Sequence, residues 1–518
     1  MTEPLTGWLV TFALALVPVF VLYFLLYNCY LLWLIALSVS QLRRRVTARS
    51  VQDLDLIDDG DLTRPLTIIV PVCNGEGTVL DRVMSLIRCD YPRFEVVLVS
   101  DGSSDGTLDR LKHAFRLRRS EVPYRPGIGT APVRAMHEAT VPLPANVLRV
   151  IVVDKEPGGR ADAFNAGINV STAPYFVPLG EESILNERAL KELMRAVQEN
   201  PGAAAVAGPV AIANGCTIRN RRVVDVGLPA RSLPRFQMVE YLRLLATAGS
   251  GRDRLRPLLM LRGVLAVFEK ETVIRAGGYL TSFLHHRIPR EYVGDTVGTE
   301  CEQLEIIVRL HRFMLDKLHG RRIVFLPHTV AWSRVPETFG SLRREIARQY
   351  RGLREVLRYH RAMLGRRRYG GIGSFALPAL WLFEYYGPLV EMAAYLCVVF
   401  VLLMERLLEY PVLDYAYLWV FLLASVGFGI LVNVLAVMLG AWRVRLGLSD
   451  RRQGHVLPFS RRRQVLILLA YAALENFGYR QLTLLWRFKG LWGAWRGKTG
   501  PPKIARGGLP RDAAPVHG

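Results

Sequence analysis

The chain has 518 residues, of which 51% are hydrophobic, and 67 Lys and Arg against 45 Asp and Glu give it a formal net charge of +22. This length exceeds one ordinary soluble domain, and this apolar content is typical of a chain with a membrane component. The arginines lie mostly beside the most apolar runs, as they do at the cytosolic ends of membrane segments, so we expect no nucleic-acid partner. The six cysteines are scattered without metal-type pairs, which favours reduced thiols over disulfides.

Residues 1–45 are predicted to form a transmembrane anchor. The uncharged apolar run from Trp8 to Val39 exceeds the roughly 20 residues that cross a bilayer as a helix. It has no basic leading segment and no small-residue cleavage site, and Arg43 to Arg45 follow it, so we expect an uncleaved anchor whose C-terminal end lies in the cytosol. Residues 46–65 are interpreted as a linker.

Residues 66–340 are predicted to form a cytosolic α/β domain. Short apolar runs such as Leu66 to Val72 and Val96 to Ser100 alternate with longer stretches of helical pattern such as Asn186 to Gln198. Strands that alternate with helices imply a mostly parallel sheet, and ligands bind such a sheet at the carboxyl ends of its strands.

The C-terminal part is predicted to return to the membrane. Residues 341–372 are rich in arginine with interspersed apolar residues, which suits a basic interfacial helix. Two apolar runs within residues 373–440 predict a transmembrane hairpin, so that the chain crosses a bilayer three times with its N-terminus outside. Residues 491–518 are rich in Pro, Gly and Arg and are interpreted as a disordered basic tail in the cytosol.

Residues 441–490 allow two topologies. The apolar run from Val465 to Leu474 is too short to cross as a helix and both of its flanks are basic, so we interpret these residues as a basic loop and an interfacial or re-entrant segment. If the run instead crossed by extending to Trp486, Glu475 and Arg480 would be buried and the tail would emerge outside.

A long ordered motif runs from Thr67 to Thr107 and reads TIIVPVCNGEGTVLDRVMSLIRCDYPRFEVVLVSDGSSDGT. The final DGSSDGT alone would also suit a turn. The order of strand, Pro-x-x-Asn, helix, Tyr-Pro, strand and Asp-Gly-Ser-x-Asp-Gly-Thr, however, resembles the opening of a glycosyltransferase family 2 domain. The resemblance implies that Pro71, Asn74, Glu76 and Asp101 bind the nucleobase and ribose of a nucleotide sugar. Carboxylates at strand ends can accept hydrogen bonds from such groups.

A second signature, VVDKEPGGRADAFNAGI, is similar to the family pattern Lys-x-x-Gly-Gly-Lys-x-x-Ala-Leu-Asn-x-Gly. Gly158 and Gly159 permit a close turn, and Arg160 replaces the family Lys as a cation that can face a diphosphate. Further stretches follow the family order as far as YRQLTLLWR at Tyr479 to Arg487. The chain most resembles the branch of cellulose, hyaluronan and poly-N-acetylglucosamine synthases. We therefore expect a GT-A-like nucleotide-sugar-binding domain with N- and C-terminal transmembrane and interfacial helices.

The resemblance implies a divalent cation that neutralises the diphosphate as it leaves, normally held by an Asp-x-Asp motif. Here the strand YFVPL ends in Gly180, Glu181 and Glu182, so the first Asp has become Gly. We expect a weakened Mg²⁺ or Mn²⁺ site at Glu182 with help from Glu181.

The base motif also departs from the family pattern Thr-Val-Gly-Glu-Asp-Met-Glu-Leu, because this chain reads TVGTECEQLE. Counting back from the following Arg-Leu-His-Arg places Glu302 and Gln303 on the Glu-Asp pair, and an amide cannot serve as a base. Counting forward from Gly298 makes Glu300 the nearest carboxylate. We expect Glu302 or Glu300 to take the acceptor proton, and the alternative is that both acids merely cap and solvate a helix start.

The third family signature, Gln-x-x-Arg-Trp, reads Glu345, Ile346, Ala347, Arg348 and Gln349. Arg348 could still pair with diphosphate oxygens, whereas the Trp that would stack on an acceptor sugar is missing. Donor-side features are therefore better kept than acceptor-side features.

The sequence leaves two functions open. The first is a multi-pass glycosyltransferase of the cell inner membrane or plasma membrane that moves a sugar, with inversion, from a UDP-linked nucleotide sugar to a polysaccharide or glycolipid acceptor. The second is a catalytically impaired relative that acts as partner or regulator of an active polysaccharide synthase. In either case the lipid bilayer is a partner, and synthase or export proteins are candidates.

Overall fold

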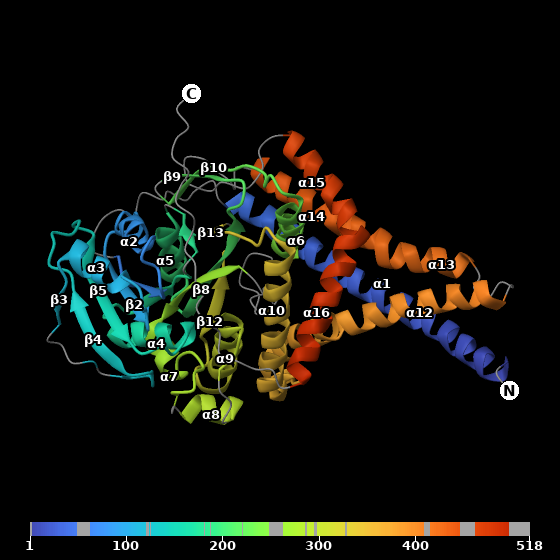
Figure 1. Cartoon of the computed structure of the whole chain (residues 1–518), viewed down its shortest axis with the longest axis horizontal. Coiled ribbons are helices and arrows are strands. Elements are labelled where there is room, and N and C mark those ends of the chain that lie inside the picture. Colours follow the sequence, from blue (N-terminus) through green and yellow to red (C-terminus); the bar gives the residue numbers. More distant parts are fainter. Residues whose placement is uncertain are drawn as a thin grey trace.

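In the computed structural model, the described residues are 3–48, 63–120, 124, 126–180, 182–186, 188–219, 221–247, 263–284, 287–294, 298–326, 329–408, 415–445 and 462–496 (Figure 1). Glu181, most of the expected linker at 46–65, part of the basic loop and most of the expected tail at 491–518 lie outside these residues. Residues 491–495, expected to be disordered, instead form the end of the helix Arg480–Trp495.

A mixed sheet forms the centre of the α/β domain. Its strand order is β3-β4-β5-β2-β1-β6-β11-β8-β13-β7, with β12 paired to β8. The four strands β5, β2, β1 and β6 are mutually parallel, whereas β11 is antiparallel to both of its neighbours. The strands are β1 (Leu66–Val72), β2 (Phe94–Asp101), β3 (Arg118–Arg119), β4 (Val133–Glu138), β5 (Val147–Lys155), β6 (Tyr175–Pro178), β7 (Ile184–Leu185), β8 (Ala203–Ile212), β11 (Val264–Glu269), β12 (Arg322–Phe325) and β13 (Ala331–Ser333), and a separate hairpin joins β9 (Thr217–Arg219) and β10 (Arg222–Asp225).

Helices cover both faces of this sheet. All seven residues of β1 are buried, as expected for a central parallel strand, and they alternate between two cores. Ile68 and Val70 pack with helices α2, α3 and α5, whereas Ile69 packs with α4, α7 and α9. These helices are α2 (Val79–Ile87), α3 (Thr107–Phe115), α4 (Arg160–Val170), α5 (Ala189–Glu199), α7 (Lys270–Arg275) and α9 (Glu302–Lys317). The predicted α/β class is confirmed, and the sheet is mixed, with its parallel strands gathered in β5, β2, β1 and β6.

Three helical segments of the described chain are long and apolar enough to cross a membrane: Thr11–Ser40, Ile372–Met404 and Leu418–Trp442. They lie together at one end of the molecule and extend away from the α/β domain (Figure 1). The expectation of one N-terminal and two C-terminal apolar helices is therefore confirmed. The elements involved are α1 (Glu3–Ala48), α11 (Leu377–Ala379), α12 (Gly387–Leu408), α13 (Tyr415–Leu422) and α14 (Phe428–Arg445), with π-helical turns at Ile372–Ala376, Leu380–Tyr385 and Leu423–Gly427.

Two further helices connect the α/β domain to these apolar helices. The basic helix α10 (Phe339–Tyr359) buries Leu342 and Ile346 in one cluster with Leu304 of α9 and Leu491 of α16 (Arg480–Trp495). The apolar face that suggested an interfacial helix is thus covered largely by protein, and contact of α10 with a membrane stays a prediction. The remaining helices are α6 (Ser232–Thr247), α8 (Arg287–Val293) and α15 (Arg462–Leu474), with short 3₁₀ turns at Arg361–Met363 and Arg367–Tyr369.

The segment after residue 461 is a broken helix. α15 and α16 meet at the π-helical turn Glu475–Tyr479, in which Phe477 (φ −112°, ψ 97°) and Gly478 (φ 91°, ψ −54°) are not helical. Gly478 adopts a left-handed backbone that glycine tolerates without a Cβ clash. The segment is not among the three candidate spans of the described chain, and its interfacial or re-entrant placement stays a prediction.

Candidate functional site

The residues expected from the first signature lie at the carboxyl ends of two neighbouring parallel strands. Pro71 of β1 is paired in register with Val99 of β2, so the loops that follow these strands meet. Asn74, with a positive φ of 52°, accepts a hydrogen bond from the Ser104 amide at 2.8 Å. Glu76 accepts one from the Gly106 amide at 3.2 Å. Asn74 and Glu76 therefore hold the two loops together at the sheet edge where a ligand is expected.

Asp101, at the end of β2, holds the glycine turn of the second signature. Its carboxylate accepts hydrogen bonds from the Gly158 and Gly159 amides, both at 2.8 Å, and it pairs with Lys155 Nζ at 2.6 Å. Only 4% of Asp101 is exposed. In this structure the carboxylate thus positions the turn, and direct contact of Asp101 with a nucleobase or ribose stays a prediction.

The structure explains why glycine occupies both position 158 and position 159. A Cβ on Gly158 would lie 2.3 Å from Asp162 Oδ2, and Gly159 has φ 90°. Asp162 itself is fully buried and pairs with Lys155 at 2.6 Å. Burial raises the pKa of Asp162, and the Lys155 charge opposes that shift. Lys155 and Asp162 are functional candidates that the sequence interpretation missed, although Lys155 is the first residue of the family signature.

Arg160, the first residue of α4, forms an ion pair with Glu302, the first residue of α9. The Glu302 side chain is 1% exposed and the Arg160 side chain 33%, so the carboxylate is enclosed while its cationic partner reaches the surface. The structure therefore joins the cation of the glycine turn to one of the two carboxylates expected to act as base. A buried carboxylate with one flexible cationic partner can be uncovered when that cation moves to another anion.

Glu300, the other expected base, is held by α10. Arg351 binds its carboxylate through Nε at 3.2 Å and Nη2 at 3.0 Å. Burial raises the pKa of Glu300, whereas Arg351 and then Arg348 lower it. Arg348 therefore lies close enough to lower the pKa of the Glu300 carboxyl group. Gln303, the residue after Glu302, is half-buried.

Glu182, the expected cation ligand, is exposed near the start of α10. Burial of part of its carboxyl group, followed by the Glu345 carboxylate, raises the pKa of Glu182. Two neighbouring carboxylates fit the oxygen donors that Mg²⁺ and Mn²⁺ prefer, since such ions often bind one or two protein carboxylates together with phosphate oxygens. Among the residues that the structure describes, no group of three or more His, Cys, Asp or Glu is close enough to hold a metal, and Glu181 lies outside those residues.

Two family models match consecutive parts of the chain. The model for glycosyl transferase family 2 matches residues 67–143, and the model for glycosyltransferase like family 2 matches residues 129–352. Residues 67–352 are thus similar to glycosyltransferase family 2 domains. This region contains the sheet edge, the glycine turn, both candidate bases and most of α10.

Curated proteins match this part of the chain at low identity. Poly-β-1,6-N-acetyl-D-glucosamine synthase from Staphylococcus aureus strain MSSA476 is 22% identical over 293 residues, which are 56% of this chain and 55% of the relative. The enzyme of the same name from Staphylococcus epidermidis is 21% identical over 297 residues. The chain thus spans about half the length of the curated relatives it matches.

Two solved structures also match at low identity. The mannosyltransferase PcManGT from Pyrobaculum calidifontis, in complex with GDP-Man and Mn²⁺, matches with a TM-score of 0.43 and 14% identity over 91% of this chain and 100% of its own. TarS from S. aureus in complex with UDP matches with a TM-score of 0.35 and 13% identity over 80% of this chain and 91% of its own.

Proposed function

We propose that this protein is a membrane glycosyltransferase that moves a sugar from a UDP-linked nucleotide sugar to a polysaccharide or lipid acceptor with inversion. The ion pair between Arg160 and Glu302 carries this proposal. In this proposal the partly exposed Arg160 would meet the donor diphosphate and the buried Glu302 would take the acceptor proton; both residues lie in the part of the chain that the family 2 model matches.

The reaction follows from these two side chains. The acceptor hydroxyl oxygen attacks the anomeric carbon, the bond from that carbon to the diphosphate oxygen breaks, and the hydroxyl proton moves to a carboxylate. Arg160 shifts from Glu302 to the diphosphate oxygens, because their greater charge competes for its guanidinium. Glu302 is then uncovered as base, and Glu300, which Arg351 holds at two atoms, is the second candidate.

A divalent cation, when bound, supplies charge neutralisation for the departing diphosphate. Glu182 and Glu345 would hold Mg²⁺ or Mn²⁺ together with phosphate oxygens, with Glu181 as a further ligand. Pro71, Asn74, Glu76 and the Asp101-supported turn would form the nucleotide side of the site, and Arg348 would face the diphosphate from α10.

The three apolar helices support a placement in the cell inner membrane or plasma membrane, with the family 2 domain in the cytosol where nucleotide sugars are made. Basic residues at 43–45 and in the loop after α14 favour this orientation, since positive residues stay on the cytosolic side. Synthase or export proteins would be the protein partners of such an enzyme.

The proposal is tested with purified full-length protein, a panel of nucleotide sugars and Mn²⁺, by measuring nucleoside diphosphate release. We expect turnover with one UDP-sugar and loss of turnover in Glu302→Gln. Arg195→Ala, which removes an exposed ion pair with Glu199 on α5, serves as the matched control and should leave turnover unchanged. Donor binding without turnover on any acceptor would overturn the enzymatic proposal in favour of the partner or regulator function.

A further inference from the structure

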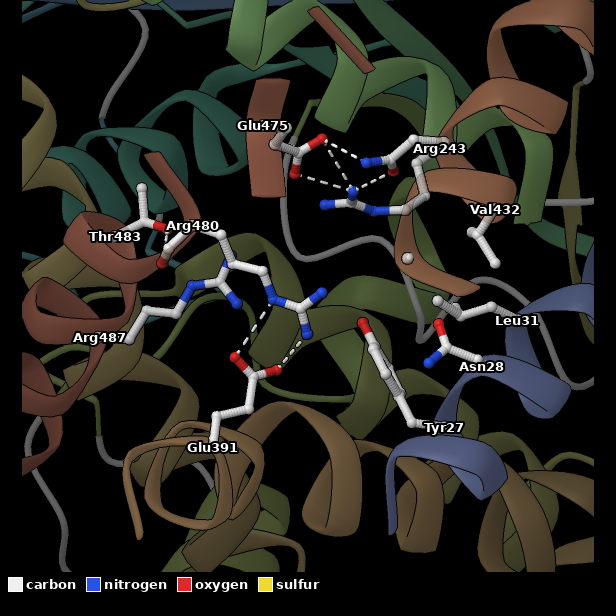
Figure 2. A pocket seen from close by; sticks show the side chains of 12 residues that line it. Tyr27, Asn28, Leu31, Arg243, Glu391, Val432, Glu475, Arg480, Thr483 and Arg487 are labelled. Atoms are coloured by element: carbon white, nitrogen blue, oxygen red, sulfur yellow. Dashed lines mark hydrogen bonds and ion pairs between the residues drawn. The ribbon is translucent and has the colours of Figure 1, made fainter. Parts of the chain in front are cut away.

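A polar pocket lies where the three candidate membrane spans meet α6 and α16. Its lining comes from α1, α6, α12, α14, α16 and the broken turn between α15 and α16 (Figure 2). Its charged side chains are Arg243, Glu391, Glu475, Arg480 and Arg487. Glu391 lies within the candidate span Ile372–Met404. Ionisable side chains at such positions are costly in a bilayer and usually serve a function.

The broken helix brings two of these charges into one space. In an unbroken α-helix, Glu475 and Arg480 would point about 140° apart, because successive residues turn by about 100°. The non-helical Phe477 and Gly478 change that direction, and both charged residues line the same pocket. The Tyr27 hydroxyl points into the same space in Figure 2.

The arginines in the pocket keep donors for a ligand. Within the described chain, Arg243 donates its hydrogen bonds from Nη1, to Asn433 at 2.5 Å and to Glu475 at 2.9 and 3.2 Å. Arg480 binds Glu391 at 2.6 and 3.4 Å. A guanidinium has five N–H donors, so Nε and Nη2 of Arg243 stay available.

Arg487 is the least neutralised of the three. Its ion pair with Glu240 is 3.8 Å long, and its guanidinium lies 5.7 Å from the centre of the Tyr350 ring. The pocket lining holds three arginines against two carboxylates. The lining itself carries more arginines than carboxylates, and Glu240 outside the lining offsets part of the Arg487 charge. The guanidinium groups bring several N–H donors to one shared space.

We propose that this pocket binds the phosphate of an anionic membrane lipid. The planar guanidinium fork matches the oxygens of a phosphate, and basic pockets between membrane helices bind anionic headgroups. A lipid is favoured over free phosphate because three candidate membrane spans contribute Tyr27, Glu391 and Asn433 to the lining. This site is separate from the pair of Arg160 and Glu302 and does not depend on the proposed sugar transfer.

The experiment is native mass spectrometry of full-length protein in a neutral detergent, titrated with phosphatidylglycerol, phosphatidylcholine or inorganic phosphate. We expect phosphatidylglycerol to bind at least about tenfold more tightly than phosphatidylcholine, and Arg487→Gln to weaken that binding roughly tenfold, as the loss of one charge-assisted contact predicts. Arg487→Lys keeps the charge but not the planar guanidinium group, so its affinity for phosphatidylglycerol should lie between those of the wild type and Arg487→Gln. Arg496→Gln, at the exposed end of α16, is the matched control and should bind as the wild type does.

The lipid series on the wild type tests the site even if Arg487→Gln fails to fold. Equal affinity for the two lipids would overturn the proposal. Inorganic phosphate that displaced phosphatidylglycerol at equal concentration would show a site for soluble anions and overturn the lipid assignment. Unchanged affinity in a folded Arg487→Gln protein would remove this pocket as the site. Because no sugar donor is present, the result is independent of glycosyltransferase activity.

Discussion

Arg160 and Glu302 form an ion pair that ties the glycine turn before α4 to the first turn of α9. Glu302 is nearly enclosed and Arg160 is one-third exposed. Arg160, which would bind the donor diphosphate, and Glu302, which would take the acceptor proton, are thus paired with each other when no donor is present. This arrangement makes the order of events testable.

Replacement of Glu302 by Gln should lower kcat by about two or more orders of magnitude, because general-base catalysis contributes about 10² to 10⁴-fold. Donor affinity should change little, since Arg160 is then released toward the diphosphate. Gln303→Ala should have a far smaller effect, because an amide is not basic. Steady-state kinetics with the preferred UDP-sugar measure each value.

The same series separates the two candidate bases. Glu300→Gln should matter less than Glu302→Gln, since Arg351 already holds Glu300 at two atoms. Full activity in the Glu300, Glu302 double amide variant would exclude both assignments. Gln303→Asp restores the family carboxylate and should raise the rate if its side chain reaches the acceptor.

Arg160→Ala should weaken binding of UDP-sugar roughly tenfold or more, because a charge-assisted contact to the diphosphate contributes about 1.5–3 kcal/mol. Arg160→Lys should recover part of this affinity, since it keeps the charge of the family residue. Titration calorimetry with UDP and with uridine provides the control. Arg160→Ala should weaken the binding of UDP, which carries the diphosphate, and leave the binding of uridine unchanged. Equal losses for UDP and uridine would point to a disrupted turn instead.

Asp101→Ala should abolish measurable heats with UDP-sugar and also destabilise the domain. The substitution leaves the Gly158 and Gly159 amides without their acceptor and removes one of two carboxylates that pair with buried Lys155. Loss of a partner from a buried ion pair costs about 3 kcal/mol or more. Thermal unfolding monitors stability in parallel. Indistinguishable heats in wild type and variant would contradict a role for Asp101 in donor binding.

Glu95 should make part of the domain's stability dependent on pH. Burial raises the pKa of its carboxyl group, but bonds from Thr67, from Arg149 at 2.6 Å and from the Thr172 amide at 2.6 Å outweigh burial and lower that pKa. A lowered folded pKa means that the stabilisation is present above the unfolded value of about 4.3 and is lost as pH falls through the folded value.

Glu95→Gln should therefore cost about 2 kcal/mol or more near pH 7 and progressively less below about pH 4. Unfolding temperatures of wild type and variant across that range measure the difference. Glu199→Gln removes an exposed ion pair and should change the unfolding temperature little, both near pH 7 and below about pH 4. If the difference in unfolding temperature between Glu95→Gln and the wild type stayed constant with pH, the carboxylate charge would be ruled out as the cause of that difference.

The orientation in the membrane is testable by cysteine accessibility in intact cells. We expect a cysteine placed in the tail after residue 497 and one placed in the α/β domain to be protected from an impermeant thiol reagent until the membrane is opened, because basic flanks keep both in the cytosol. A cysteine in the loop between α12 and α13 should react directly. Labelling of the tail in intact cells would mean that the segment containing Glu475 and Arg480 crosses the membrane.

The sequence by itself determined the fold class and the apolar helices. β1 is apolar except for Thr67, which predicts a buried central strand, and the uncharged run in α1 is long enough to cross a bilayer, so both follow from local pattern and length. The two donor-side signatures could also be located, because each is contiguous in the chain. Family models now match those residues as glycosyltransferase family 2.

Only the tertiary structure decided which of these residues meet. Arg160 and Glu302 are far apart in sequence, and their contact requires α4 and α9 to pack on the same face of the sheet. Glu475 and Arg480 share a pocket because of a backbone break at Gly478 that hydropathy does not reveal. Patterns along the chain report burial and local conformation, whereas the pairing of charges depends on long-range packing that brings distant segments within a few ångströms.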